Sequence, residues 1–354
     1  MIRVLSVAGA LPRHRAAQAD VRRTYASIFQ DNRALRRYLP IFSGSGVDER
    51  RFVRPLDYYR EGRSFSERNA VYIEEAPRLA RAALEDALKA AARDGGELGH
   101  LISATTTGLA TPSLEAILAH DMGLPPRMAR TPLFGTGCAS GAVALTRACE
   151  AAIARPGLLS AAVAVELCSL TLRHDDPSVA NLVGCALFGD GAAAAVVQDV
   201  LDRPRWLGAP APAVAAWESH LFPDSRGVMG WGFDGGGMRL VLTPEVPALV
   251  ARRLKPVILD FLRRHGAAAS QVRHWVLHPG GIKVIEAYEA AFGLSAWDTR
   301  WSRRCLRAIG NVSSASVLFM LEDLQREGKP RAGDVGLVAA LGPGFAAEML
   351  LLRW

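Results

Sequence analysis

Two nearly continuous apolar runs constrain the fold of this 354-residue chain more than any other feature. Residues 159–166 and 191–197 contain almost no polar side chains, which is typical of strands that are buried on both faces of a sheet. Apolar positions with a helical period lie before them over residues 66–93, and a further helix is expected over residues 139–154. Strands that alternate with helices predict an α/β fold with a mostly parallel central sheet.

A Pro- and Gly-rich stretch over residues 201–212 is the best candidate for a domain boundary. We therefore expect an N-terminal half over residues 1–200 and a C-terminal half over residues 201–354. Each half is expected to alternate helices and strands, with a first strand at the start of the chain. The later expected elements are helix 20–40, strand 100–107, helix 114–124, helix 247–265, strand 275–277, helix 314–327 and strand 335–340. This similar content is consistent with an internal duplication, although no sequence repeat is strong enough to prove it.

The cysteines and the apolar runs exclude several classes of protein. Five scattered cysteines without a CxxC pair argue against a disulfide framework and against a zinc site, and they favour a reduced, cytoplasmic setting. The apolar stretch before Ala8-Gly9-Ala10 is too short for a signal peptide, and no run approaches the length of a membrane span. Gly230-Trp-Gly-Phe-Asp-Gly235 matches GxGxxG, but aromatic residues fill the loop and no helix follows, so no dinucleotide site is expected there.

The chain is basic, with a net charge of +7 and a pI near 9.5. Arginine pairs are spread along it, at 22–23, 36–37, 50–51 and 303–304. A solvated basic surface explains any one pair. The alternative is that the charge attracts an anionic ligand, such as coenzyme A or an acidic carrier protein. Nothing in the sequence is typical of nucleic-acid binding, so no nucleic-acid partner is expected.

Three short segments far apart in the chain carry candidate catalytic residues: Gly137-Cys138-Ala139-Ser140-Gly141, His278-Pro279-Gly280-Gly281 and Gly310-Asn311-Val312-Ser313-Ser314. Cys138 is expected at a strand-to-helix turn, where a helix N-terminus lowers the thiol pKa and offers N–H donors. His278 is expected to end a strand at the sheet edge where α/β proteins bind ligands. Taken singly, the three residues have ordinary structural explanations: core packing, a structural histidine and helix capping. Together they supply a nucleophile, a base and an oxyanion donor.

With these segments, the chain resembles the type III polyketide synthases of the chalcone synthase superfamily over nearly its whole length. The other similar stretches are residues 165–171, 186–194 and 341–344. Pro-Gly-Gly after His278 favours this family over the ketoacyl synthase III branch, which usually has a Gln-Ala-Asn run there. The resemblance implies a five-layered αβαβα thiolase fold made of two similar halves, and a homodimer.

The resemblance also implies a reaction. Cys138 would accept a starter from acyl-CoA or an acyl carrier protein, and His278 would keep it ionised as a thiolate–imidazolium pair. His278 and Asn311 would then hold the thioester carbonyl of malonyl-CoA while it loses CO₂. The resulting carbanion attacks the Cys138 thioester, so the chain grows by two carbons per cycle. Coenzyme A thioesters are the substrates, and neither a metal nor a separate cofactor is implied.

Several residues around this triad are carried over from the family. Phe188 matches the gatekeeper phenylalanine between the CoA tunnel and the cavity, while Leu240 and Leu341 stand where aromatic residues are usual. The other cavity positions are Thr106, Thr111, Cys168, Thr171 and Ser313. Coenzyme A would be met by Arg50 and Arg51 at the place of the family's basic segment, and by Gly280, Gly281 and Lys283.

The lost aromatic residues favour an aliphatic starter. Residues 39–59, 165–171 and 229–231 are similar to bacterial alkylresorcinol and alkylpyrone synthases, so a fatty acyl starter and a cyclised alkylpyrone or alkylresorcinol product are expected. Two alternatives stay open. One is a ketoacyl-synthase-III-like enzyme that performs a single condensation or acyl transfer, and the other is a catalytically silent acyl-binding homologue. The presence of all three triad residues argues against the silent homologue.

Overall fold

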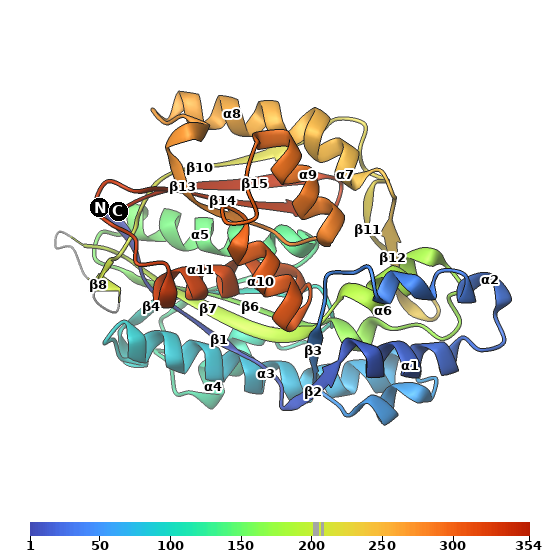
Figure 1. Cartoon of the computed structure of the whole chain (residues 1–354). Helices are drawn as coiled ribbons and strands as arrows, with labels where there is room; N and C mark the ends of the chain where they lie inside the picture. The colour runs from blue at the N-terminus through green and yellow to red at the C-terminus, as the bar shows by residue number, and fades with distance from the viewer. Residues whose placement is uncertain (201–204, 207–208) are drawn as a thin grey trace.

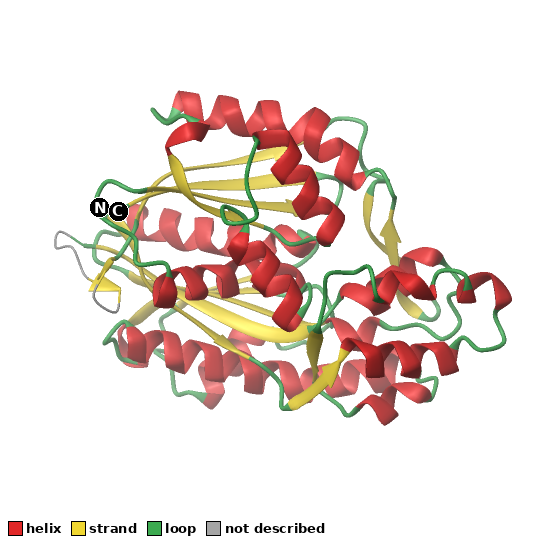
Figure 2. Ribbon diagram, in the orientation of Figure 1, coloured by secondary structure: helices red, strands yellow, loops and turns green. Residues whose placement is uncertain are grey.

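The structure is a computed structural model that describes residues 1–200, 205–206 and 209–354. Figures 1 and 2 show five layers, in which two layers of strands alternate with three layers of helices. This agrees with the expected αβαβα architecture. The expected boundary at residues 201–212 lies partly outside the described residues. Within the described part of the chain, no helix is long and apolar enough to cross a membrane.

The strands of the two halves pair in the same pattern. In the first half, β4 is parallel to β5 and to β6, and β6, β7 and β1 follow as antiparallel neighbours. In the second half, β13 is parallel to β14, and β14, β15 and β10 follow as antiparallel neighbours. The nine strands are β1 (Ile2–Ala10), β4 (Leu98–Ala104), β5 (Ala129–Leu133), β6 (Leu159–Leu167), β7 (Asp190–Asp199), β10 (Ala213–Leu221), β13 (Val272–Leu277), β14 (Val335–Gly342) and β15 (Ala346–Arg353).

A pairing of β1 with β10 joins the two strand layers into one hydrogen-bonded order, β13-β14-β15-β10-β1-β7-β6-β4-β5. The sheet is therefore mixed, and the expectation of a mostly parallel sheet was wrong. The short turn between β14 and β15 explains part of the difference, because adjacent strands joined by a tight turn run antiparallel. Three small ladders lie outside this sheet: β2 (His14–Ala17) with β3 (Glu49–Phe52), β8 (Arg205–Trp206) with β9 (Ala209–Pro210), and β11 (Met229–Asp234) with β12 (Gly237–Leu242).

Helices cover both outer faces and fill the middle layer (Figure 1). α3 packs on β1, β6 and β7, α5 and α11 pack against each other between the strand layers, and α8 lies over the second strand layer. The α-helices are α1 (Gln18–Ile28), α2 (Arg33–Arg36), α3 (Phe65–Ala90), α4 (Leu114–Asp121), α5 (Ser140–Ala154), α6 (Val179–Leu187), α7 (Val246–Leu249), α8 (Lys255–Arg264), α9 (Ile282–Phe292), α10 (Arg300–Ile309) and α11 (Ser316–Glu327). The helix expected over 247–265 is broken into α7, a π-turn and α8.

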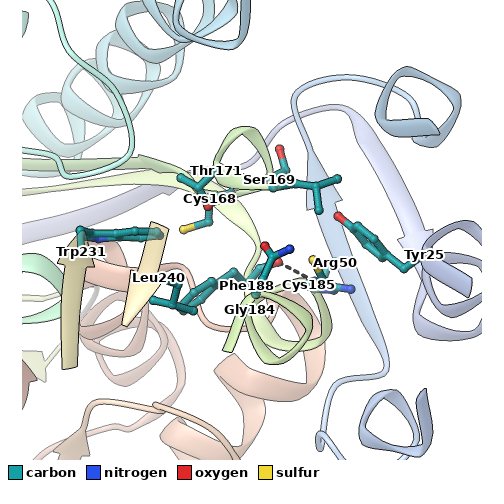
Figure 3. Close-up of a pocket in the computed structure, with 12 residues that line it drawn as sticks. Tyr25, Arg50, Cys168, Ser169, Thr171, Gly184, Cys185, Phe188, Trp231 and Leu240 are labelled. Carbon is teal, nitrogen blue, oxygen red and sulfur yellow. Dashed lines mark hydrogen bonds between the residues drawn. The ribbon is translucent and has the colours of Figure 1, made fainter. Parts of the chain in front are cut away.

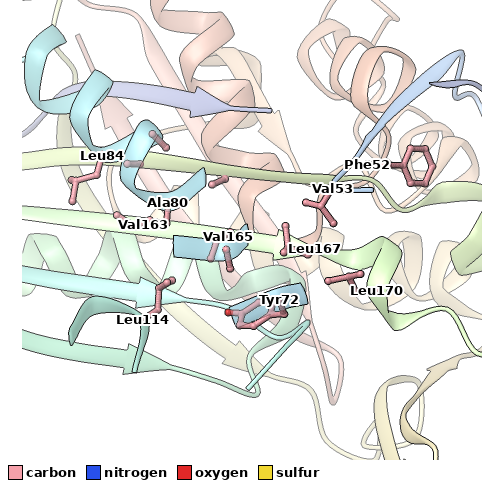
Figure 4. Packing of buried hydrophobic residues seen from close by; sticks show 14 of the residues in the cluster. Phe52, Val53, Tyr72, Ala80, Leu84, Leu114, Val163, Val165, Leu167 and Leu170 are labelled. Atoms are coloured by element: carbon pink, nitrogen blue, oxygen red, sulfur yellow. The ribbon is translucent and has the colours of Figure 1, made fainter. Parts of the chain in front are cut away.

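The two apolar runs become β6 and β7, the strands at the centre of the first half. Along β6, alternate side chains enter two different cores: Val163 and Val165 face α3, whereas Ala162 and Ala164 face the middle helices. Figure 4 shows the α3 side of this packing. Since each face buries side chains against a helix layer, apolar residues are favoured on both faces, which explains the nearly continuous apolar sequence.

Candidate active site

Cys138 lies in a tight turn that leads into α5. The turn is a 3₁₀ segment, Gly137–Ala139, which continues directly into the helix at Ser140. Gly137 has a φ of +50°, and a Cβ there would lie 2.5 Å from the Pro343 ring. A Cβ on Gly141 would lie 2.1 Å from the carbonyl oxygen of Ser314. The two glycines around Cys138 therefore let the turn fit between two other segments, and the thiol lies at the positive end of α5.

His278 follows the last residue of β13. Its backbone N–H donates to the carbonyl oxygen of Ala339 on β14 at 2.9 Å, and Gly280 N–H donates to the His278 carbonyl at 3.0 Å. The side chain is buried, yet neither Nδ1 nor Nε2 has a hydrogen-bond partner among the described residues. A buried imidazole without partners is unusual because buried polar groups are normally satisfied. Its ring is therefore available to a substrate.

Asn311 is held on both sides by backbone bonds. Its N–H donates to the Leu187 carbonyl at 2.8 Å, and its carbonyl accepts from Gly189 N–H at 3.0 Å, which places it beside Phe188. Its side-chain Oδ1 accepts from the N–H of Ser313 at 2.9 Å. Because Oδ1 is engaged, the Nδ2 amide group is the end of this side chain that can donate to a ligand.

The three segments meet at one end of the second strand layer. β14 ends at Gly342, where a Cβ would lie within 2.8 Å of Ala139 Cβ and the Thr136 carbonyl, so the Cys138 turn touches this strand end. His278 follows β13, the parallel neighbour of β14. On the other side, Cys138 Sγ lies 3.3 Å from Ser313 Oγ. The family resemblance placed Ser313 on the cavity wall, whereas in the structure its hydroxyl is a direct partner of the thiol.

Burial keeps both ionisable members of the triad neutral. It raises the pKa of the Cys138 thiol to about 11, an effect that Glu166 strengthens and that the Ser313 hydroxyl opposes. Burial also lowers the pKa of His278 to about 4. A neutral thiol and a neutral imidazole differ from the thiolate–imidazolium pair that the family resemblance implies. A neutral imidazole can accept the thiol proton, so His278 still suits the role of a general base.

The low pKa of His278 predicts a specific loss of stability in acid. The unfolded chain protonates His278 near the ordinary pKa of 6.5, whereas the folded chain resists protonation until about pH 4. Stability that is present above pH 6.5 is therefore lost as the pH falls, by about 2 kcal/mol at pH 5. Denaturant unfolding at pH 7 and pH 5 should show that His278→Gln loses less stability than the wild type. An equal loss in both proteins would contradict the buried neutral imidazole.

The buried side chain of Glu166 links several segments of the site by hydrogen bonds, and the sequence did not predict this role. Glu166, at the end of β6, accepts bonds from Thr106 N–H and its hydroxyl, from the Thr107 hydroxyl at 2.8 Å and from the Ser314 hydroxyl at 2.6 Å. Its burial raises its pKa. The only signal in the sequence is an acidic residue inside an otherwise apolar strand, since such a residue needs several donors when buried. The expected cavity residue Thr106 belongs to this network.

A narrow cavity lies behind Phe188 (Figure 3). Four of the residues expected from the family line it together: Cys168, Thr171, Phe188 and Leu240. Its volume is about 20 Å³, room for about one water molecule. Trp231, opposite Leu240 on the β11–β12 hairpin, also lines it and adds an aromatic wall that the sequence did not predict. The GxGxxG match at 230–235 is thus part of this hairpin.

Arg50 is in a different place from the one expected. It was expected at a coenzyme A entrance, but it is 1% exposed and lines the cavity behind Phe188. Its Nη1 donates to the Phe188 carbonyl at 2.6 Å, while Nε and Nη2 have no partner among the described residues. The reason is strand alternation: Arg50 and Phe52 share the buried face of β3, and the guanidinium lies 5.4 Å from the Phe52 ring centre.

The other residues that were expected to contact coenzyme A or line the cavity differ in how exposed they are. Arg51 and Gly280 are partly exposed, Gly281 is buried, and Lys283 is exposed at the start of α9. Thr111 was expected on the cavity wall, but it is exposed on the loop before α4. Among the described residues, no group of three or more His, Cys, Asp or Glu side chains could hold a metal ion.

Comparisons with known proteins place this geometry in one family. Residues 56–199 match the N-terminal domain of the chalcone and stilbene synthases, and residues 214–354 match their C-terminal domain. The chain therefore belongs to the chalcone and stilbene synthase family, as a type III polyketide synthase. It is an enzyme of the acyltransferase class.

Individual relatives resemble it over nearly their whole length. A 1,3,6,8-tetrahydroxynaphthalene synthase from Streptomyces peucetius subsp. caesius is 40% identical, with 99% of this chain and 93% of the relative covered. A putative chalcone synthase from Bacillus subtilis (strain 168) is 36% identical, with 99% and 98% covered. The crystal structure of the bacterial type III polyketide synthase 1,3,6,8-tetrahydroxynaphthalene synthase from Streptomyces coelicolor A3(2) superimposes with a TM-score of 0.93, 30% identity and 99% of both chains covered.

Proposed function

We propose that this polyketide synthase extends an acyl group on Cys138 by repeated decarboxylative condensation with malonyl-CoA and then releases a cyclised product. The observation that carries the proposal is the buried His278 ring with two unpartnered nitrogens, beside a segment that holds Asn311 with its amide donor available. These groups suit a ligand that presents a carbonyl oxygen rather than a protein partner.

The first half-reaction loads the starter. The Cys138 thiol passes its proton to His278 and its sulfur attacks the thioester carbonyl of the acyl donor. The bond to the donor sulfur breaks, and the leaving thiolate, of CoA or of a carrier protein, takes the proton from the imidazolium. The positive end of α5 stabilises the oxyanion that forms in between. The Ser313 hydroxyl, 3.3 Å from Sγ, can donate to the thiolate and so lower the cost of ionisation.

The second half-reaction makes the carbon–carbon bond. The malonyl thioester oxygen accepts hydrogen bonds from a neutral His278 N–H and from Asn311 Nδ2. As the C–CO₂ bond breaks, its electron pair becomes an enolate, and these two donors stabilise the charge on oxygen. The enolate carbon attacks the Cys138 thioester, the C–S bond breaks, and the lengthened chain is now on CoA. Transfer back to Cys138 begins the next cycle.

For the starter we propose a fatty acyl group, giving an alkylpyrone or an alkylresorcinol. Support comes from Leu240, which lines the cavity where the family usually has an aromatic residue. Leu240 leaves more space in the cavity for an aliphatic chain than an aromatic residue would, whereas Leu341, at the end of β14, is packed in the hydrophobic core of the second strand layer. We propose CoA contacts at Arg51, Gly280, Gly281 and Lys283, and no cofactor beyond the CoA of the substrates.

A second candidate is a compact polyhydroxylated aromatic product, as made by the relatives named tetrahydroxynaphthalene synthase. The observation that favours it is the polar wall of the cavity. Arg50, Tyr25, Ser169, Thr171 and Asn181 all line it, and a small space with such walls suits an oxygen-rich chain better than an alkyl tail.

A series of starters separates these products. Purified enzyme would receive radiolabelled malonyl-CoA with acetyl-, octanoyl- or palmitoyl-CoA, or with no other starter, and products would be analysed by mass spectrometry. Cyclised tri- or tetraketides from long-chain starters are the expected result. An aromatic product from malonyl-CoA alone would establish the second candidate, and a single linear β-ketoacyl product would instead indicate a ketoacyl-synthase-III-like enzyme.

We propose that the enzyme works as a homodimer in the cytoplasm, with the N-terminal half over residues 1–200 supplying Cys138 and the C-terminal half over 201–354 supplying His278 and Asn311. All five cysteines are free, which supports a reducing compartment. Size-exclusion chromatography with light scattering tests the dimer.

A further inference from the structure

The β11–β12 hairpin forms one wall of the cavity. Trp231 on β11 and Leu240 on β12 are directly paired across the hairpin, and both line the same cavity as Phe188 (Figure 3). The hairpin pairs only within itself rather than with the large sheet, and it extends toward α6 (Figure 1). Its position over the cavity therefore depends on its packing against α6, on the bond from Gly344 N–H to the Met229 carbonyl at its base, and on what holds its tip.

Two buried arginines from the N-terminal half hold that tip. Arg173 donates from Nη1 to Asp234 Oδ1 at 2.5 Å, and Arg68 donates from Nη2 to the Gly236 carbonyl at 2.8 Å. Both side chains are less than 10% exposed, at 7% and 8%. Asp234 Oδ1 also accepts from Gly236 N–H at 2.8 Å, which closes the turn of the hairpin. Arg173 and Arg68 therefore bind two residues of the same turn.

Arg68 also binds the segment of the cavity wall that carries Thr171. Its Nη1 donates to the carbonyl oxygens of Leu170 and Leu172, at 3.2 and 2.6 Å. These residues flank Thr171, which lines the cavity. A single guanidinium thus spans from the Thr171 wall to the tip of the hairpin that carries Trp231. Such a planar group with several fixed donors sets a distance more firmly than a flexible ammonium would.

We propose that Arg68 and Arg173 are positioning residues that clamp the hairpin and so set the depth of the cavity, which decides how many malonyl units are added before release. This inference rests on the proposed function, because it assumes that the growing chain enters this cavity and that the hairpin then moves outward from its present position, which leaves room for about one water molecule. The clamp touches neither the thiol nor the triad, so it acts on the extent of extension rather than on the chemical step. Arg173 also holds the pKa of Asp234 below its usual range, which keeps this carboxylate charged.

The chain offers a matched control for the test. Arg173 binds two carboxylates, Asp234 on the hairpin and Asp175 in its own loop, where Nε and Nη2 donate at 2.9 and 2.5 Å. Both aspartates are partly or largely exposed, at 47% and 66%, so either can be replaced with little risk to folding. Asp234→Ala releases the hairpin from Arg173, whereas Asp175→Ala removes an equivalent ion pair without touching the hairpin.

The product distribution is measured for the wild type and both variants with one starter and excess malonyl-CoA. We expect Asp234→Ala to change the ratio of longer to shorter polyketides by about threefold or more, since small displacements at a reacting site have large effects. Asp175→Ala should leave that ratio unchanged, and malonyl-CoA consumption should stay within about twofold in both variants, as expected for sites far from the triad. An unchanged ratio in Asp234→Ala, or equal changes in both variants, would overturn the proposal.

A second measurement does not depend on turnover. Amide hydrogen exchange over residues 229–242 should be faster in Asp234→Ala and unchanged in Asp175→Ala, and Asp234→Leu, which also has no acceptor for Arg173, should give the same result if the alanine variant is unstable. Unaltered exchange in both Asp234 variants would show that the arginines do not hold the hairpin. If the wild type makes no polyketide at all, the proposed function is wrong. If the wild type makes polyketides but Asp234→Ala gives the same ratio of longer to shorter products, only the proposal about the two arginines is wrong.

Discussion

Replacing Cys138 with alanine is expected to abolish polyketide formation, with a loss of about 10⁴-fold or more, as for other covalent nucleophiles. The reason is that Cys138 is the group on which every intermediate is proposed to be built, at the N-terminus of α5 and 3.3 Å from the Ser313 hydroxyl. Incorporation of radiolabelled malonyl-CoA into extractable products measures this loss.

The matched control is Cys149→Ala in α5, the helix that follows the Cys138 turn. Cys149 is fully buried in the core between the strand layers, and burial raises its pKa. Its replacement should lower stability but leave turnover per folded enzyme unchanged, because buried cysteines of this kind act as small hydrophobes. Product formation by Cys138→Ala at the wild-type rate would show that the nucleophile has been assigned wrongly.

Asn311→Ala is expected to slow malonyl-CoA decarboxylation by about 10²- to 10³-fold, the usual cost of losing one donor to a developing oxyanion. Acylation of Cys138 should suffer less, because Asn311 is assigned to the malonyl thioester oxygen and not to the thiol. Release of labelled CO₂ measures the first reaction, and the mass of the Cys138 peptide measures the second.

Asn311→Asp is the more exact companion variant. Aspartate keeps an oxygen that can accept the Ser313 N–H, a bond of 2.9 Å in the wild type, but it has no N–H to donate. It should therefore preserve the local turn and still lose decarboxylation. If both variants lost acylation and decarboxylation equally, Asn311 would have a general structural role instead.

The places of Cys138 and His278 in the fold could be predicted from the sequence because both residues lie in short segments with clear sequence patterns. Gly137 and Gly141 mark the close packing around Cys138, and the apolar β13 marks the strand end at His278. The apolar runs likewise predicted β6 and β7 within one or two residues. The glycine spacing and the apolar pattern can be read from the local sequence, although the segments that pack against the two glycines, at Pro343 and Ser314, lie far along the chain.

What the sequence could not predict depends on contacts between distant segments. Arg50 stands in a charged stretch, Asp48-Glu49-Arg50-Arg51, which looks like surface, and only the pairing of β3 turns its side chain into the cavity. The burial of Glu166 is explained only by the hydrogen bonds that Thr106, Thr107 and Ser314 donate to its carboxylate.

The β11–β12 hairpin was missed for a related reason. Its glycines and aromatic residues gave no clear periodicity, and the side chains that fix its tip come from α3 and from the loop after β6. No local pattern in the sequence therefore predicted that Trp231 lines the cavity. The mixed sheet was missed because strand direction follows from the connections rather than from the apolar runs themselves.

The central claim is that Cys138 carries the growing chain, and peptide mass spectrometry tests it most directly. Enzyme incubated with an acyl-CoA starter alone, then quenched in acid and digested, should show the acyl group on the peptide that contains Cys138. After a brief addition of malonyl-CoA, the same peptide should carry the acyl group lengthened by two-carbon units. An adduct on Cys168 or Cys185, or extended products without any adduct on Cys138, would contradict the claim.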